Sequence, residues 1–183
     1  MATASTKASA GSATTTKAKG KTTKGKSKNK TTKASKTEDA TAMLRADHKR
    51  VSELFGNYEK ARSTSRKREL VATICTELTV HAQLEEEIFY PAVKKALKDK
   101  ELVPEATVEH ATLKDLIAQV KGVEPDGEMF DAKIKVLSEY VKHHVKEEQG
   151  EMFAKAKKTK LDMNALGAQM ATRKKELMQS GTV

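Results

Sequence analysis

Two histidines that lie on apolar stripes of the sequence are followed four residues later by a glutamate on the same stripe, His81 by Glu85 and His144 by Glu148. On a helix, residues four apart lie one above the other on the same face, so each pair would present an imidazole and a carboxylate to one point. Neutral imidazole and carboxylate are both ligands of divalent transition metals. The two pairs therefore predict a metal site inside a helical protein.

The other histidines support this interpretation through their spacing. The chain has five histidines, and four of them lie on apolar stripes whose members are three and four residues apart, one stripe in each of four segments. The interior of a bundle built from these stripes would hold four imidazoles and two carboxylates. The stripes are Leu44, His48, Val51, Phe55 and Tyr58; Val71, Ile74, Leu78, His81, Glu85 and Ile88; Ala106, His110, Leu113, Ile117 and Val120; and Phe130, Ile134, Leu137, Val141, His144, Glu148 and Met152.

A single histidine on an apolar helix face is more often a hydrogen-bonded core residue than a ligand. Glu85 and Glu148 argue against that alternative, because a buried carboxylate without a partner is very costly and neither has a Lys or Arg on its stripe. Six nitrogen and oxygen ligands are too many for one tetrahedral zinc, so two cations bridged by the glutamates, with water, oxide or dioxygen completing their shells, fit better. No acid lies three residues before any histidine, which excludes the Glu-x-x-His pattern of ferritin-type di-iron bundles.

The elements that would position these residues are helices. From Glu38 onward Ala, Leu, Lys and Glu dominate, and proline occurs only at 91, 104 and 125. Residues 63–65 supply capping side chains, and residues 122–127 form a break between segments. We predict an all-α fold: an up-down-up-down four-helix bundle over residues 38–160 and a short extra C-terminal helix over 161–183. Asp162 would cap this last helix, which would pack on the bundle through Leu166, Met170 and Leu177.

At these positions the chain resembles the hemerythrin-like, HHE cation-binding family over roughly residues 40–178. The strongest similarity lies in residues 81–91 (HAQLEEEIFYP) and 143–153 (HHVKEEQGEMF), with Asp47-His48 and Glu109-His110 also matching. The resemblance implies a four-helix bundle with a non-haem di-iron centre, two irons per chain with an oxo or hydroxo bridge, that binds dioxygen and in some members senses oxygen or iron. The metal ligands that it implies are His48, His81, Glu85, His110, His144 and Glu148.

Two observations refine this expectation. His144 continues the apolar stripe of the fourth segment and has Glu148 four residues later, so His144 is the expected ligand and His143 faces outward or packs behind the ligands. Oxygen-carrying hemerythrins have a second histidine where this chain has Lys114, and an aspartate spaced differently from Glu148. The chain therefore resembles the HHE branch, and we expect it to bind or sense dioxygen, iron or nitric oxide. The alternatives are an enzyme that acts on peroxide at the same centre and a nucleic-acid-associated protein.

Residues 1–37 differ sharply in composition from the rest. They hold ten of the 35 basic residues and no acid, so residues 38–183 carry 25 basic and 25 acidic residues, and the net charge of +10 belongs to this tail. With almost no apolar side chains to bury, we expect the tail to be disordered. It would bind DNA or another polyanion by neutralising phosphates, or serve only to keep the protein soluble. The lysines that we assign to such binding are Lys17, Lys19, Lys21, Lys24, Lys26, Lys28 and Lys30.

Compartment and membrane association can also be predicted. The single cysteine, Cys75, fits a reducing environment. The longest apolar runs are only a few residues, too short to span a membrane, and the N-terminus lacks a secretory signal pattern. We therefore expect a cytoplasmic protein without a membrane partner.

Overall fold

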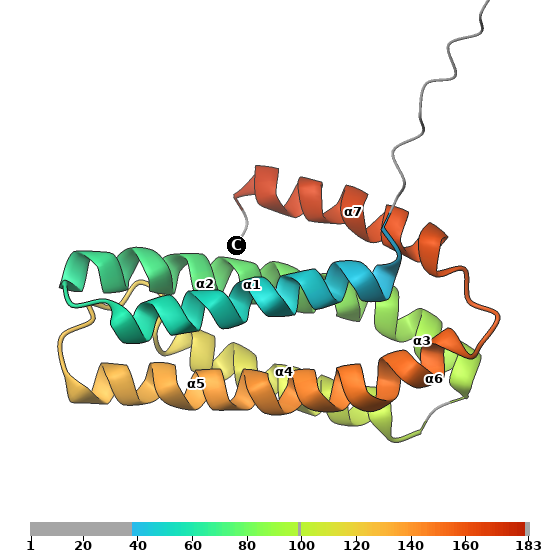
Figure 1. Cartoon of the computed structure of the whole chain (residues 1–183), viewed down its shortest axis with the longest axis horizontal. Coiled ribbons are helices and arrows are strands. Elements are labelled where there is room, and N and C mark those ends of the chain that lie inside the picture. Colours follow the sequence, from blue (N-terminus) through green and yellow to red (C-terminus); the bar gives the residue numbers. More distant parts are fainter. Residues whose placement is uncertain (1–37, 99, 182–183) are drawn as a thin grey trace, which may run out of the picture. The chain divides into compact units, whose positions relative to one another are not determined.

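The computed structural model describes residues 38–98 and 100–181, and every regular element in them is helical. Four helical segments run alternately in opposite directions along a bundle, and a fifth helix packs on its outside (Figure 1). The predicted all-α bundle is confirmed. The interpretation of residues 1–37, including the seven lysines assigned to polyanion binding, lies outside the described residues. The elements are α1 (Ala40–Lys60), α2 (Thr64–Leu84), η1 (Glu85–Phe89), α3 (Tyr90–Leu97), α4 (Leu102–Ala118), α5 (Glu128–Glu147), η2 (Glu148–Met152), α6 (Phe153–Lys157) and α7 (Met163–Ser180).

Three helices begin at capping side chains. The Asp39 carboxylate accepts a hydrogen bond from the Ala42 N–H, and the Ser63 hydroxyl accepts one from the Arg66 N–H. Asp162 accepts from the N–H groups of residues 164 and 165 at the start of α7. Each bond satisfies a backbone donor that the first helical turn would leave without a partner. The cap positions therefore explain where α1, α2 and α7 start.

Two π-helical turns interrupt the second and fourth segments of the bundle. In η1 the Tyr90 N–H donates to the Glu85 carbonyl, and in η2 the Phe153 N–H donates to the Glu148 carbonyl, so both bonds span five residues instead of four. Each turn begins at a glutamate that the sequence places among the metal ligands. Because a π turn holds one more residue than an α turn, it changes which later side chains face the core. The second segment thus consists of α2, η1 and α3, and the fourth of α5, η2 and α6.

The core consists of two apolar clusters with a polar layer between them. One cluster includes Phe55, Ile74 and Leu137, and the other includes Leu44, Phe89 and Phe153. The six expected metal ligands are buried in the layer that separates them. A continuous apolar core would be more stable than one divided by charged groups, so the division suggests that this layer has a function.

Helix α7 packs on α1 and α2 (Figure 1). Its Met170 and Leu177 are buried in the second cluster. Gly167 makes the closest approach, since a Cβ added there would lie 2.1 Å from the Glu38 carbonyl oxygen. The position therefore requires glycine for space, because even alanine would overlap the backbone at the start of α1.

Within residues 38–98 and 100–181, no helix combines the length and the apolar character needed to cross a lipid bilayer.

Candidate metal centre

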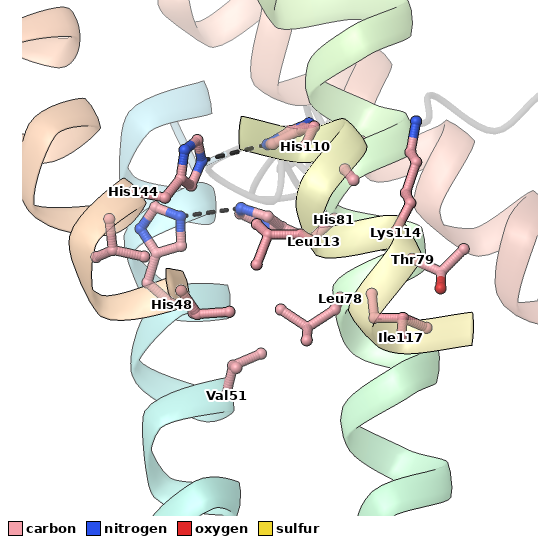
Figure 2. A pocket seen from close by; sticks show the side chains of 13 residues that line it. His48, Val51, Leu78, Thr79, His81, His110, Leu113, Lys114, Ile117 and His144 are labelled. Atoms are coloured by element: carbon pink, nitrogen blue, oxygen red, sulfur yellow. Dashed lines mark hydrogen bonds between the residues drawn. The ribbon is translucent and has the colours of Figure 1, made fainter. Parts of the chain in front are cut away.

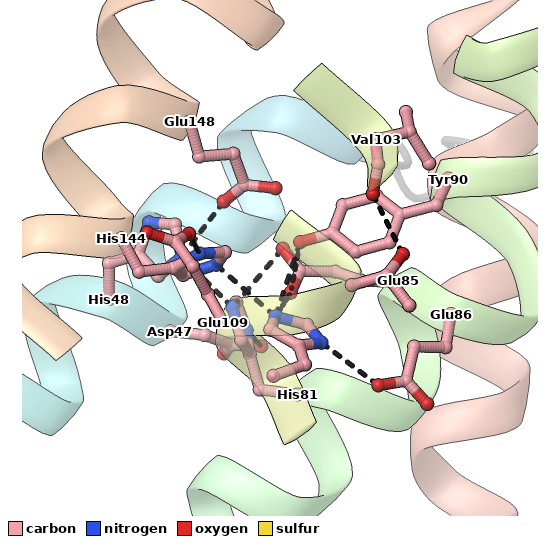
Figure 3. A network of polar contacts seen from close by, with 12 residues as sticks. Asp47, His48, His81, Glu85, Glu86, Tyr90, Val103, Glu109, His144 and Glu148 are labelled. Carbon is pink, nitrogen blue, oxygen red and sulfur yellow. Dashed lines mark hydrogen bonds and ion pairs between the residues drawn. The ribbon is translucent and has the colours of Figure 1, made fainter. Parts of the chain in front are cut away.

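The six side chains that the sequence singles out converge at one place in the bundle (Figures 2 and 3). Helix α1 contributes one histidine, α2 and η1 a histidine and a glutamate, α4 one histidine, and α5 and η2 a histidine and a glutamate. All six are buried, with less than a tenth of each side chain's surface exposed. They are His48, His81, Glu85, His110, His144 and Glu148.

The four histidines form two pairs whose Nε2 atoms face each other (Figure 2). These atoms are 2.9 Å apart in the pair of His48 and His81, and 3.2 Å apart in the pair of His110 and His144. Two nitrogens bound at right angles to one ion, each about 2.1 Å from it as in zinc sites, would be about 3 Å apart. The spacing of each pair is therefore that of neighbouring ligands on a single cation.

The Glu85 carboxylate joins the two pairs. Its Oε1 lies 3.2 Å from Nε2 of His81, and its Oε2 lies 3.3 Å from Nε2 of His110. Glu148 adds a carboxylate at the first pair, where its Oε2 lies 3.3 Å from Nε2 of His48. Two groups of ligand atoms result, each with its members within 4.8 Å of one another, and Glu85 belongs to both. This arrangement suits two cations that share Glu85.

Carboxylates on the outer side of the histidines orient three of the rings. Nδ1 of His144 donates to Oε2 of Glu109 at 2.7 Å, and Nδ1 of His110 donates to Oε1 of Glu86 at 3.0 Å. Nδ1 of His81 lies 3.7 Å from Oδ2 of Asp47, within the range of an ion pair. A proton held on Nδ1 leaves Nε2 unprotonated and pointing inward, as metal-binding histidines require.

The donor set also contains buried atoms without a hydrogen-bond partner. Both carboxylate oxygens of Glu148 and Oε1 of Glu85 are buried in this way. Burial raises the pKa of the Glu148 carboxyl well above its usual range, and the neighbouring Glu85 carboxylate raises it further. Buried carboxylates that repel each other are costly, and a shared cation would neutralise both. The residues present therefore fit a pair of metal ions.

The two histidines of the first pair, His48 and His81, differ strongly in pKa. Burial, and then the charge of His81, lower the pKa of His48 to about 3, so its ring is neutral and offers a lone pair at physiological pH. Burial also lowers the pKa of His81, but the charge of Glu85 and the contact with Asp47 outweigh it and raise that pKa to about 9. A cation would have to displace the His81 proton, so metal binding at this pair should release a proton.

Two aromatic residues, which the sequence pattern does not assign to the site, enter it through the π turns. The Tyr90 hydroxyl lies 3.4 Å from Oε2 of Glu85 and 3.2 Å from Nε2 of His110. Burial raises the pKa of Tyr90 above its usual range, and Glu85 raises it further, so the phenol keeps its proton. Phe153 stacks on His48 with ring centroids 6.1 Å apart. The signal in the sequence is the five-residue step from a stripe glutamate to an aromatic residue, which occurs after Glu85 and after Glu148.

Two residues that the sequence analysis kept apart from the ligands lie outside the group. His143 is on the surface of α5 with 61% of its side chain exposed, and its Nε2 contacts Glu109 and Glu147. Lys114 is half exposed and pairs with Glu86 at 2.6 Å, so the position of the second histidine of oxygen carriers holds a cation that faces the surface.

An apolar cavity adjoins the four histidines on the side toward the first core cluster (Figure 2). Its volume is about 30 Å³, where about 10–15 Å³ on this measure suffices for one water molecule. Apart from the histidines, Thr79 and Lys114, the lining side chains are aliphatic: Val51, Leu78, Ala82, Leu113, Ile117, Val141 and Val145. A molecule of about two heavy atoms would fit between these side chains and the histidine nitrogens.

Comparisons with known proteins agree with this geometry. The hemerythrin HHE cation binding domain matches residues 39–156. A protein described as a DNA nickase from Nostoc sp. is 30% identical over 112 residues, which are 61% of this chain and 32% of that protein, so the match spans about a third of the relative's length. The crystal structure of a hemerythrin HHE cation binding domain-containing protein from Mycobacterium kansasii superposes with a TM-score of 0.67 at 23% identity. It covers 78% of this chain and 89% of that one, which shows a shared fold.

Proposed function

Because this chain belongs to the hemerythrin HHE cation binding domain family, we propose that its buried cluster holds two iron ions and binds or senses a small diatomic molecule, dioxygen or nitric oxide. The family supplies the cation-binding character. The proposed ligands are His48, His81, Glu85, His110, His144 and Glu148, and the proposal rests on the convergence of these six buried side chains.

The proposal of a diatomic ligand rests on one observation, the apolar cavity next to the histidine pairs. Dioxygen and nitric oxide make few hydrogen bonds in water and lose little on entering an aliphatic space. Peroxide would leave several hydrogen bonds behind, at a cost of about 1–3 kcal/mol for each unsatisfied group. The cavity therefore favours a diatomic ligand over the alternative of a peroxide-consuming enzyme.

The residues around the cluster have separate tasks in this proposal. Bound iron would supply an electron-rich metal with an open coordination position. Val51, Leu78 and Ile117 line the cavity next to the histidines and make it apolar, which disfavours water there. The Tyr90 hydroxyl, held between Glu85 and His110, keeps a proton beside the centre as a hydrogen-bond donor.

Filling the cavity should weaken ligand binding without removing iron. Val51→Leu adds a methylene group, which leaves less room for a bound ligand. Overpacking typically costs about 1–3 kcal/mol, and a cost near the lower end, borne only by the ligand-bound protein, lowers ligand affinity about tenfold. Val136→Leu is the matched control, because Val136 is an exposed residue of α5 that does not line the cavity. The measurement is the optical spectrum of anaerobically reduced, iron-loaded protein titrated with dioxygen and then with nitric oxide.

Equal affinities in the two valine variants would contradict the assignment of the cavity. A spectrum that responds to neither gas, combined with rapid turnover of added peroxide, would instead support the enzymatic alternative.

A second proposal concerns residues 1–37: we propose that they bind DNA or another polyanion, because they carry the whole net charge of +10. Deleting them should abolish duplex binding and leave the iron content unchanged. If all ten lysines contact phosphates, the logarithm of the binding constant should fall with that of the salt concentration with a slope of roughly −9. Titrating labelled duplex at several salt concentrations with full-length and truncated protein tests this, and undiminished binding by the truncated form would place the contact on the bundle.

A further inference from the structure

A third group of metal-ligand side chains lies at the surface, next to the buried centre. It consists of Glu109 from α4 and of His143 and Glu147, one turn apart on α5. Nε2 of His143 lies 3.4 Å from Oε1 of Glu109 and 3.3 Å from Oε1 of Glu147. One imidazole nitrogen and two carboxylate oxygens therefore face one another within 4.8 Å, and the histidine is open to solvent.

Glu109 connects this surface group to the centre. Its Oε1 faces His143. Its Oε2 accepts the hydrogen bond from Nδ1 of His144 (Figure 3). The same side chain thus contacts a surface ligand with one oxygen and orients a buried ligand with the other.

A narrow cavity leads from the surface group toward the buried ligands. Glu105, Glu109 and Glu147 line it together with His144 and Glu148. Its volume is about 10 Å³, enough for about one water molecule. Glu148 is buried, and neither of its carboxylate oxygens has a hydrogen-bond partner, so the buried side of this cavity holds carboxylate oxygens that are free to accept a ligand.

We propose that Glu109, His143 and Glu147 form a loading site for a divalent metal cation, which passes from there along the acidic cavity to Glu148 and His144. The proposal rests on the proposed function, in which the cation that fills the centre is ferrous iron. One imidazole and two carboxylates bind ferrous iron, manganese and zinc. Three ligands at a solvent-exposed position hold such an ion weakly, which suits a site that must release it. Exposed side chains that merely pair with each other would leave the loading rate unaffected.

The first experiment measures how fast full-length protein takes up iron after its metal has been removed with a chelator. Ferrous iron is added without oxygen, and samples are quenched at intervals with a ferrous chelator to count the protected iron. His143→Ala and Glu147→Gln should load about tenfold more slowly than the wild type, the lower end of electrostatic effects on association, and reach the same final content. Glu139→Gln is the matched control, since Glu139 is an exposed acid on α5 outside the cavity lining. Equal loading rates in all four proteins would overturn the loading role.

The second experiment detects the surface site directly. In iron-saturated protein, the EPR signal of aqueous Mn²⁺ measures the free ion, and the wild type should bind about one Mn²⁺ more than His143→Ala. Equal binding by the two proteins would overturn the site. If the wild type retains no iron at all, the proposed function fails, and the same titration of the protein as purified still decides whether the surface site exists.

Discussion

His144→Ala is expected to lower the iron content from about two ions per chain to about one or fewer, whereas His143→Ala should leave it near two. His144 is buried, and its Nε2 lies 3.2 Å from that of His110, so its removal leaves that pair with one imidazole and a shared carboxylate. The neighbouring His143 is exposed and contacts Glu109 and Glu147. The same substitution at two adjacent residues should therefore lower the iron content in one variant and leave it unchanged in the other. Elemental analysis of the purified proteins measures the difference, with circular dichroism to verify that both variants are folded.

Equal iron contents in the two variants would show that the centre does not use His144. One zinc and no iron in wild-type protein from iron-replete medium would contradict the di-iron centre itself, because the two ligand groups that share Glu85 call for two cations.

Metal removal should lower the melting temperature by at least about 5 °C. Without a cation, the buried Glu85 and Glu148 carboxylates lie close together, and burial raises the pKa of Glu148 well above its usual range. A ligand present at about 100 times its dissociation constant stabilises the folded state by about 2.7 kcal/mol, and each kcal/mol shifts the melting temperature of a chain of this size by about 2–4 °C. Scanning calorimetry before and after chelation measures the shift, and identical melting temperatures would mean that no ion occupies the cluster.

The difference in folding stability between metal-loaded and metal-free protein should also grow as pH rises from 6.5 to 9. The pKa of His81 is raised from 6.5 to about 9, so its contribution is complete below pH 6.5 and is lost as pH rises through the higher value. The raised pKa of Glu148 acts in the same direction, because the folded state again holds a proton that the unfolded state releases. Bound metal takes the place of these protons, so the metal-loaded protein does not lose this stability as pH rises. A difference that narrows over this range would contradict the assignment of His81 and Glu148 as ligands.

The sequence predicts the burial of the stripes well up to the two glutamates and also at Met152 after Glu148, but not after Glu85. Steps of three and four residues place every stripe residue before Glu85 and Glu148 in the buried core. After Glu85 the same counting selects Ile88, which is only partly buried, while the core contains Phe89 and Tyr90. The reason is the extra residue in η1, which a regular helical period cannot represent. The π turn is a response to packing and to the positioning of Glu85, and both depend on neighbouring helices.

Which histidine each of the orienting acids contacts could not be predicted from the sequence, for another reason. Asp47 and Glu109 each precede a histidine, but each contacts the histidine of a different helix: Asp47 faces His81, and Glu109 binds His144. A residue next to a stripe points about 100° away from it, so its partner depends on which helix packs on that side. Spacing within one helix carries no information about that neighbour.

The π turns also determine where the chain can change in length. In a regular helix, removing one residue turns everything after it by about 100° and would separate the two halves of an apolar stripe. Removing one residue inside Glu85–Phe89 or Glu148–Met152 would instead convert a five-residue turn into an ordinary four-residue one, so that Tyr90 or Phe153 would keep facing its glutamate. These two turns are therefore the places in the second and fourth segments where related chains can be one residue shorter and keep both sides of the centre in register. An alignment with such relatives should place its single-residue gaps there.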